Sequence, residues 1–207
     1  MRFIAVLALL AACGGPDGPP VRGVIESDLE GWSFRRYQSV LDVEVWVKGN
    51  RAVAHTASYA RKDAEARGRL DSDDVVSAFV TRYQRDNGIA VALVRFARRL
   101  ASESGYRVEE REVEGVRLVE VHGAGESWVM WPSRRHVVKI GGRGRESIPD
   151  PVVEAYGELY PSRLRQGALE APLEPEPELE PATPVEPADP DNPRPDWNKG
   201  KKKKGAS

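Results

Sequence analysis

The chain of 207 residues has a single cysteine, three histidines and, beyond its first residues, no long apolar run. One cysteine excludes an intrachain disulfide, so the fold depends on a hydrophobic core. A membrane-spanning helix needs about 20 apolar residues, and no such stretch follows the start of the chain. The Gly-x-Ser-x-Gly, His-Glu-x-x-His and Walker patterns are missing, and no two histidines have zinc-site spacing. The sequence therefore predicts no catalytic residue, no metal site and no cofactor.

The one apolar run is residues 3–12, directly after Arg2. A run of this length is too short to cross a bilayer and is typical of the h-region of a signal peptide. It ends in Leu10-Ala11-Ala12-Cys13, which contains the only cysteine of the chain. This motif resembles the lipobox of bacterial lipoprotein precursors. The resemblance covers residues 1–13 only, and the family of the remaining chain is not recognised.

The lipobox resemblance implies cleavage before Cys13 and a diacylglyceryl group on its sulfur. Two or more acyl chains anchor a protein firmly, whereas one chain binds only marginally. The expected location is therefore a cell-envelope membrane, with the protein facing the periplasm. Gly14 stands where many inner-membrane lipoproteins have aspartate, which favours the outer membrane.

Composition divides the chain into five segments. Residues 1–12 are the expected signal peptide, and residues 13–21 a lipidated N-terminus with a flexible spacer rich in Gly and Pro. Residues 22–168 carry the aliphatic and aromatic periodicity and predict a single domain. Residues 169–198 are rich in Pro and Glu and predict a disordered linker, and residues 199–207 form a Lys-rich tail.

Charge is distributed unevenly beneath the formal net charge of -1. Residues 170–193 contain eight acidic and no basic residues, whereas residues 194–207 contain six basic residues and Asp196, a net of +5. If the linker is extended, it spans up to roughly 90 Å at about 3.1 Å per residue. Five lysines are too few to argue for nucleic-acid binding.

The periodicity of the central segment predicts an α+β domain with an antiparallel sheet of about six strands and three helices packed on one face. The expected order is β-β-α-α-β-β-β-β-α, followed by the disordered C-terminal arm. The expected strands are 41–47, 51–59, 106–112, 116–122, 126–131 and 136–141, and the expected helices are 72–87, 89–104 and 150–161.

Two groups of residues are candidates for anion binding. Arg143 and Arg145 lie in a glycine-rich loop before a predicted helix, although a solvated loop explains them as well. Lys201, Lys202, Lys203 and Lys204 form the basic tip, for which pairing with the acidic linker is the alternative. Arginines on the two predicted helices, including Arg82, Arg85 and Arg98, form either a headgroup-facing surface or ordinary solvated faces.

Tryptophans are the candidates for ligand binding. Trp46 shares a predicted strand face with Asp42 and Glu44, so either that face is covered or Trp46 is exposed and functional. Trp128 and Trp131 are expected on opposite faces of one strand, one in the core and the other at the base of a ligand groove.

The sequence alone favours a non-enzymatic binding or scaffolding lipoprotein, whose arm contacts a cell-wall polymer or anionic lipid. The alternative is a periplasmic carrier or chaperone for an apolar ligand. An enzyme of unrecognised type comes third and requires His55, His122 or His136 to cluster with carboxylates in a pocket. The sequence gives no oligomeric state.

Overall fold

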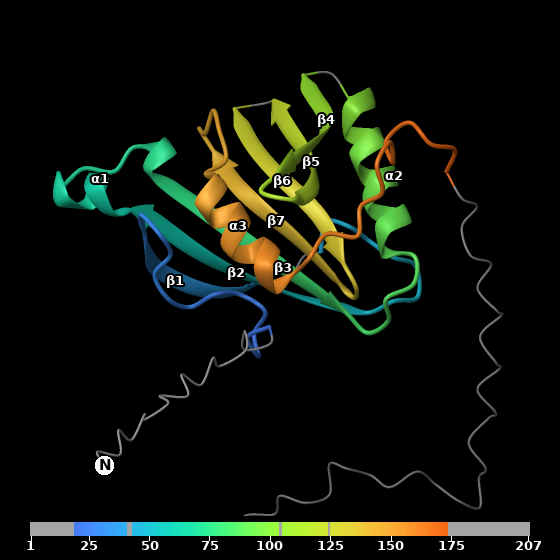
Figure 1. The fold of residues 1–207 in the computed structure, drawn as a ribbon, viewed down its shortest axis with the longest axis horizontal. Coiled ribbons are helices and arrows are strands. Elements are labelled where there is room, and N and C mark those ends of the chain that lie inside the picture. Colours follow the sequence, from blue (N-terminus) through green and yellow to red (C-terminus); the bar gives the residue numbers. More distant parts are fainter. Residues whose placement is uncertain (1–18, 41–42, 104, 124, 174–207) are drawn as a thin grey trace, which may run out of the picture. The chain divides into compact units, whose positions relative to one another are not determined.

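The computed structural model describes residues 19–40, 43–103, 105–123 and 125–173 (Figure 1). In these residues, seven strands form one antiparallel sheet with the spatial order β1-β2-β3-β7-β6-β5-β4. The α+β class with an antiparallel sheet is confirmed, with seven strands rather than about six. The strands are β1 (Trp32–Val40), β2 (Ala52–Arg61), β3 (Val75–Tyr83), β4 (Tyr106–Val113), β5 (Val116–Gly123), β6 (Glu126–Ser133) and β7 (His136–Arg143).

The helices of the described residues are α1 (Lys62–Ala66), α2 (Ile89–Ser102) and α3 (Asp150–Leu159). The two long helices pack on opposite faces of the sheet. Trp131 of β6 belongs to the same buried cluster as residues of α3. Trp128, three residues earlier on the same strand, belongs to the cluster with residues of α2. Because successive strand residues point to opposite faces, β6 is buried on both sides. The expectation that all helices cover one face is wrong.

The segment predicted as helix 72–87 is mainly strand β3, preceded by a single 3-10 turn at Ser72–Asp74. Strand β3 lies inside the sheet, between β2 and β7. Its backbone hydrogen bonds are made to both neighbours, and Val76, Ala78 and Val80 are buried on the α3 face. Apolar residues on both faces gave a spacing that also fits a helix.

The first strand also differs from the prediction. It is β1, residues 32–40, whereas the described residues 43–47 of the predicted strand form an irregular loop. β1 is an edge strand with a register shift between Phe34 and Arg36, which interrupts its alternation. A turn lies between the expected strands 41–47 and 51–59, at Lys48-Gly49, where the Asn50 amide donates to the Val47 carbonyl at 3.0 Å.

The four strands predicted after α2 are confirmed, and they form two hairpins, β4–β5 and β6–β7. α3 begins at Asp150-Pro151 as predicted, where proline costs no helix hydrogen bond, and ends at Leu159, two residues before the expected end. None of the helices in the described ranges is long and apolar enough to cross a membrane. Cys13, most of the acidic linker and the Lys-rich tail lie outside the described residues.

Candidate functional site

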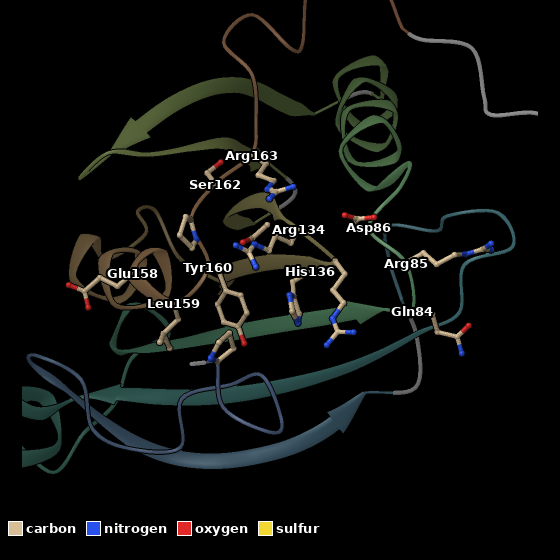
Figure 2. A pocket seen from close by; sticks show the side chains of 14 residues that line it. Gln84, Arg85, Asp86, Arg134, His136, Glu158, Leu159, Tyr160, Ser162 and Arg163 are labelled. Carbon is tan, nitrogen blue, oxygen red and sulfur yellow. The ribbon is translucent and has the colours of Figure 1, made fainter. Parts of the chain in front are cut away.

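A cleft of about 1090 Å³ opens at one end of the sheet (Figure 2). Three connections form its walls: residues 84–86 after β3, the turn between β6 and β7, and residues 160–163 after α3. Four arginines line it: Arg85, Arg134, Arg135 and Arg163. The acidic lining residues are Asp86 and Glu158, so the formal charge of the lining is four minus two, or +2.

Backbone contacts hold the arginines of the cleft in place. Ser133 pairs with His136, so Arg134 and Arg135 form a two-residue turn, with Arg134 at a positive φ of 47°. The amide of Arg163 donates to the carbonyl of Pro132 at 2.8 Å, which ties the segment after α3 to the end of β6. Figure 2 shows the Arg134 and Arg163 side chains near each other, above Tyr160 and His136.

Tyr160 links this wall to the core. Its carbonyl accepts a hydrogen bond from Trp131 Nε1 at 2.8 Å, and its hydroxyl donates to the Gly23 carbonyl at 2.6 Å. Both residues are buried. The wall that carries Arg163 is therefore attached to the sheet through a buried hydrogen bond, and the cleft is part of the folded core rather than a loose loop.

Three of the arginines have no acidic partner in the part of the chain that the structure describes: Arg134, Arg135 and Arg163. Arg85 differs, because its guanidinium donates to the Gly49 carbonyl at 2.5 Å and points away from the cleft in Figure 2. Unneutralised guanidinium groups around one cavity create a positive potential, and their planar donors fit carboxylate and phosphate groups. The arrangement suits an anionic ligand.

His136 lies at the base of the cleft, with its ring 5.1 Å from that of Tyr160 in an edge-to-face arrangement. Burial lowers the pKa of His136 below its usual value of 6.5, and the charges of Arg135 and Arg82 lower it further. The imidazole is therefore neutral at pH 7. A bound anion would offset the two arginine charges and favour the protonated ring.

His122 is the histidine that clusters with carboxylates. Its Nε2 lies 3.1 Å from Oε1 of Glu120, and its Nδ1 lies 2.9 Å from Oγ of Ser127. This connectivity resembles a nucleophile, base and acid relay. Ser127, however, is buried, with only 4% of its surface exposed.

One carboxylate, that of Glu109 on β4, completes a possible set of metal ligands. Donor atoms of Glu109, Glu120 and His122 all lie within 4.8 Å of one another. The sequence had excluded a zinc site because no two histidines are closely spaced. A search for one histidine and two carboxylates on paired strands would have found this group.

His55 contacts the neighbouring strand through Tyr37. The hydroxyl of Tyr37 is 2.7 Å from its Nδ1, and the two rings stack at 5.6 Å. Burial lowers the pKa of His55, with further lowering by Arg82 and Arg22. It forms no ion pair with a carboxylate within the described residues.

Of the two loop arginines singled out from sequence, Arg143 is exposed, whereas Arg145 is only 5% exposed. The guanidinium of Arg145 donates to the carbonyls of Asp73 at 2.6 Å and Val75 at 2.8 Å. Its interpretation as an anion-binding residue is wrong, because its donors hold the start of β3. The four lysines of the basic tip, Lys201, Lys202, Lys203 and Lys204, lie outside the described residues.

The three candidate tryptophans differ in how far they are exposed. Trp128 and Trp131 lie on opposite faces as predicted, but they are 3% and 0% exposed, so neither forms the base of a ligand groove. Trp46 is 69% exposed, and the reading in which its face is covered is wrong. It borders a cavity of about 390 Å³ together with Val43, Val47 and other residues.

Sequence reasoning placed Arg82 and Arg85 on a helix and so missed the cleft. The signal that was available is the run Arg134-Arg135-His136, which begins between the expected strands 126–131 and 136–141. No protein-family model matches the chain, and neither a curated protein nor a solved structure is significantly similar to it.

Proposed function

We propose that the protein is a non-enzymatic envelope lipoprotein, tethered through a lipid on Cys13, whose domain binds an anionic envelope component in the arginine-lined cleft. The carrying observation is that Arg134, Arg135 and Arg163 surround one cavity and have no acidic partner among the described residues. The ligand class is a cell-wall polymer or the headgroup of an anionic lipid. The membrane is the outer one, and the domain faces the periplasm.

The chemistry of the cleft supports an anion over an apolar molecule. Apolar ligands are held in sites lined mainly by aliphatic and aromatic side chains. Here ten of the fourteen lining residues are polar or charged, four of them arginines, and the other four are Pro19, Leu159, Tyr160 and Pro161. Arg134, Arg135 and Arg163 are exposed, so each contact with an anion contributes only about 0–1 kcal/mol, and several of them must act together on one ligand.

Binding of the mature chain to anionic vesicles and to isolated cell-wall polymer tests the proposal. Arg134→Ala combined with Arg163→Ala should weaken binding at least tenfold, which corresponds to about 1.4 kcal/mol. The matched control is Arg36→Ala combined with Arg69→Ala, which removes the same charge from exposed positions away from the cleft. Equal weakening by both pairs would mean that net charge, not the cleft, drives binding.

The Lys-rich tail at residues 199–207 supplies a second basic contact in this proposal. A chain ending at Leu173 keeps the described residues, including Ala171, whose carbonyl accepts a hydrogen bond from Arg98. That truncated chain should bind the same anionic surface more weakly than the full chain. Identical affinities would remove the arm from the proposal and leave the cleft.

A second candidate function, a carrier for an apolar ligand, is favoured by Trp46 alone. The indole is exposed beside a cavity whose lining also includes Val43, Val47, Ala52 and Tyr83. Exposed tryptophan beside aliphatic side chains suits an acyl chain. Titration with a fatty acid should then quench the fluorescence of the wild type and have a much smaller effect on Trp46→Phe. Equal quenching in the two proteins, or none in either, rejects this candidate.

A further inference from the structure

The β4–β5 hairpin brings three metal-binding side chains together at the end of the sheet away from the cleft. Glu109 of β4 is paired with Glu120 of β5, and His122 follows two residues later on the same face. Their donor atoms lie within 4.8 Å of one another. We propose that Glu109, Glu120 and His122 bind a divalent transition-metal ion of the Zn²⁺ type.

The histidine is oriented as in protein metal sites. Ligating histidines usually donate the second ring N–H to a fixed acceptor, which sets the tautomer and the ring direction. Ser127 Oγ, opposite His122 in the β5–β6 ladder, lies 2.9 Å from Nδ1 and can accept a hydrogen bond from it. The 3.1 Å separation of Nε2 from the Glu120 carboxylate places a proton between them when no metal is bound. A metal ion would replace that proton, and the proton left on Nδ1 would donate to Ser127.

Glu120 provides the buried carboxylate, with a side chain only 6% exposed. A buried carboxylate requires a compensating charge, which Arg111 supplies at 3.2 Å. The guanidinium of Arg111 is also 3.7 Å from Asp150 at the start of α3. A cation at Glu120 therefore leaves Arg111 a second carboxylate to pair with, so metal binding need not isolate the arginine.

Glu109 closes the site on the solvent side. Its carboxylate is exposed and 3.8 Å from Arg107, at the long end of ion-pair distances, so it is free to rotate toward the metal. Metal–ligand bonds to nitrogen and carboxylate oxygen are about 2.0–2.2 Å, so two donors on one ion lie about 3–3.5 Å apart. His122 Nε2 and Glu120 Oε1 already have this separation at 3.1 Å, so Glu109 is the ligand that must come closer. A small rotation of this exposed side chain supplies the change. One nitrogen and two oxygens leave coordination positions for water.

The donor set selects the class of metal. Imidazole suits Zn²⁺, Cu²⁺ and Ni²⁺, whereas Mg²⁺ and Ca²⁺ prefer all-oxygen sites. The site is also separate from the arginine-lined cleft, because Ser127 and Ser133 are six residues apart on β6, about 20 Å along an extended strand. A failure of metal binding would therefore leave the anion-binding proposal unaffected, and the reverse also holds.

Calorimetric titration of the untagged mature chain with ZnCl₂ at pH 7.5 tests the site. One equivalent should bind saturably, and MgCl₂ at the same concentration should give no such transition. His122→Gln should weaken Zn²⁺ binding at least tenfold, and Ser127→Ala about tenfold through loss of ring orientation. His55→Gln and His136→Gln are the matched controls and should retain the wild-type affinity.

Glu120→Gln risks unfolding because it changes a buried ion pair, so Glu109→Gln on the exposed side provides the carboxylate test. It should weaken Zn²⁺ binding at least fivefold while leaving the far-ultraviolet circular dichroism spectrum unchanged. Absence of saturable Zn²⁺ binding, or affinity within twofold of wild type in both His122→Gln and Glu109→Gln, would overturn the proposal.

Discussion

Gly157 in α3 offers a test of how the helix sits on the sheet. A methyl group placed on Gly157 would overlap the Cγ2 methyl of Val116 on β5, far inside the ordinary contact distance of about 3.5–4.0 Å. The next atoms of Val116, Cβ at 3.6 Å and Cγ1 at 3.8 Å, are at normal separations. The conflict thus involves one methyl group of a buried, β-branched side chain that cannot rotate freely.

Two opposing effects determine the outcome of Gly157→Ala. Replacing glycine by alanine inside a helix stabilises by about 1 kcal/mol, whereas overpacking a core costs about 1–3 kcal/mol. The free energy of unfolding should therefore fall in the wild-type background. Val116→Ala removes two methyl groups, costs about 1.6 kcal/mol at 0.8 kcal/mol each, and opens the space. In that background Gly157→Ala should stabilise the protein.

Urea denaturation of the four proteins in this cycle measures the coupling between Gly157 and Val116. We expect a coupling free energy of about 1–3 kcal/mol in favour of the double variant. The same effect of Gly157→Ala in both backgrounds, within about 0.5 kcal/mol, would refute the packing of α3 against β5 at this point.

Three further predictions concern the cleft and its surroundings. Trp131→Phe removes the donor to the Tyr160 carbonyl and should lower the free energy of unfolding by about 1–3 kcal/mol; an unchanged urea midpoint would contradict that bond. Trp46→Ala should change stability by less than about 0.5 kcal/mol, since the indole is exposed, and a larger loss by the same assay would place it in the core. The pKa of His136 is lowered in the folded state, so the unfolded chain binds its proton first and stability falls as pH decreases through 6.5. His136→Gln should lessen this pH dependence without abolishing it, because the pKa of His55 is also lowered in the folded state. An unaltered profile of unfolding free energy against pH would contradict this prediction.

The second half of the fold was predictable because its signals are local. The hairpin β4–β5 turns at Glu114-Gly115, both at positive φ, and α3 begins at a proline. The first half was not, because β3 has apolar residues on both faces and their spacing also satisfies a helix. Only its position between β2 and β7, a long-range property, decides between the two.

The candidate sites also combine local features, which the sequence shows, with long-range contacts, which it does not show. The arginines of the turn were visible in the sequence, but Arg163 joins them through a hydrogen bond to Pro132, a contact between segments about thirty residues apart. Arg145 shows the opposite error, since its charge pointed to a ligand whereas its donors are taken by backbone carbonyls. Charge in a sequence indicates a cation but does not tell whether its donors are already used.

The proposed tether changes what affinity the cleft needs. Exposed arginines bind weakly in isolation, because solvent screens each charge and ordering a long side chain costs entropy. A lipid on Cys13 would hold the domain near its target at an effective concentration of the order of millimolar, so a modest intrinsic affinity is enough for occupancy. Low concentrations of salt should then release the untethered domain from anionic vesicles. In the lipidated protein, salt should disrupt only the contacts of the cleft, because the anchor keeps the protein on the membrane. In the proposed lipoprotein the anchor supplies residence at the membrane, and the cleft supplies orientation and choice of ligand.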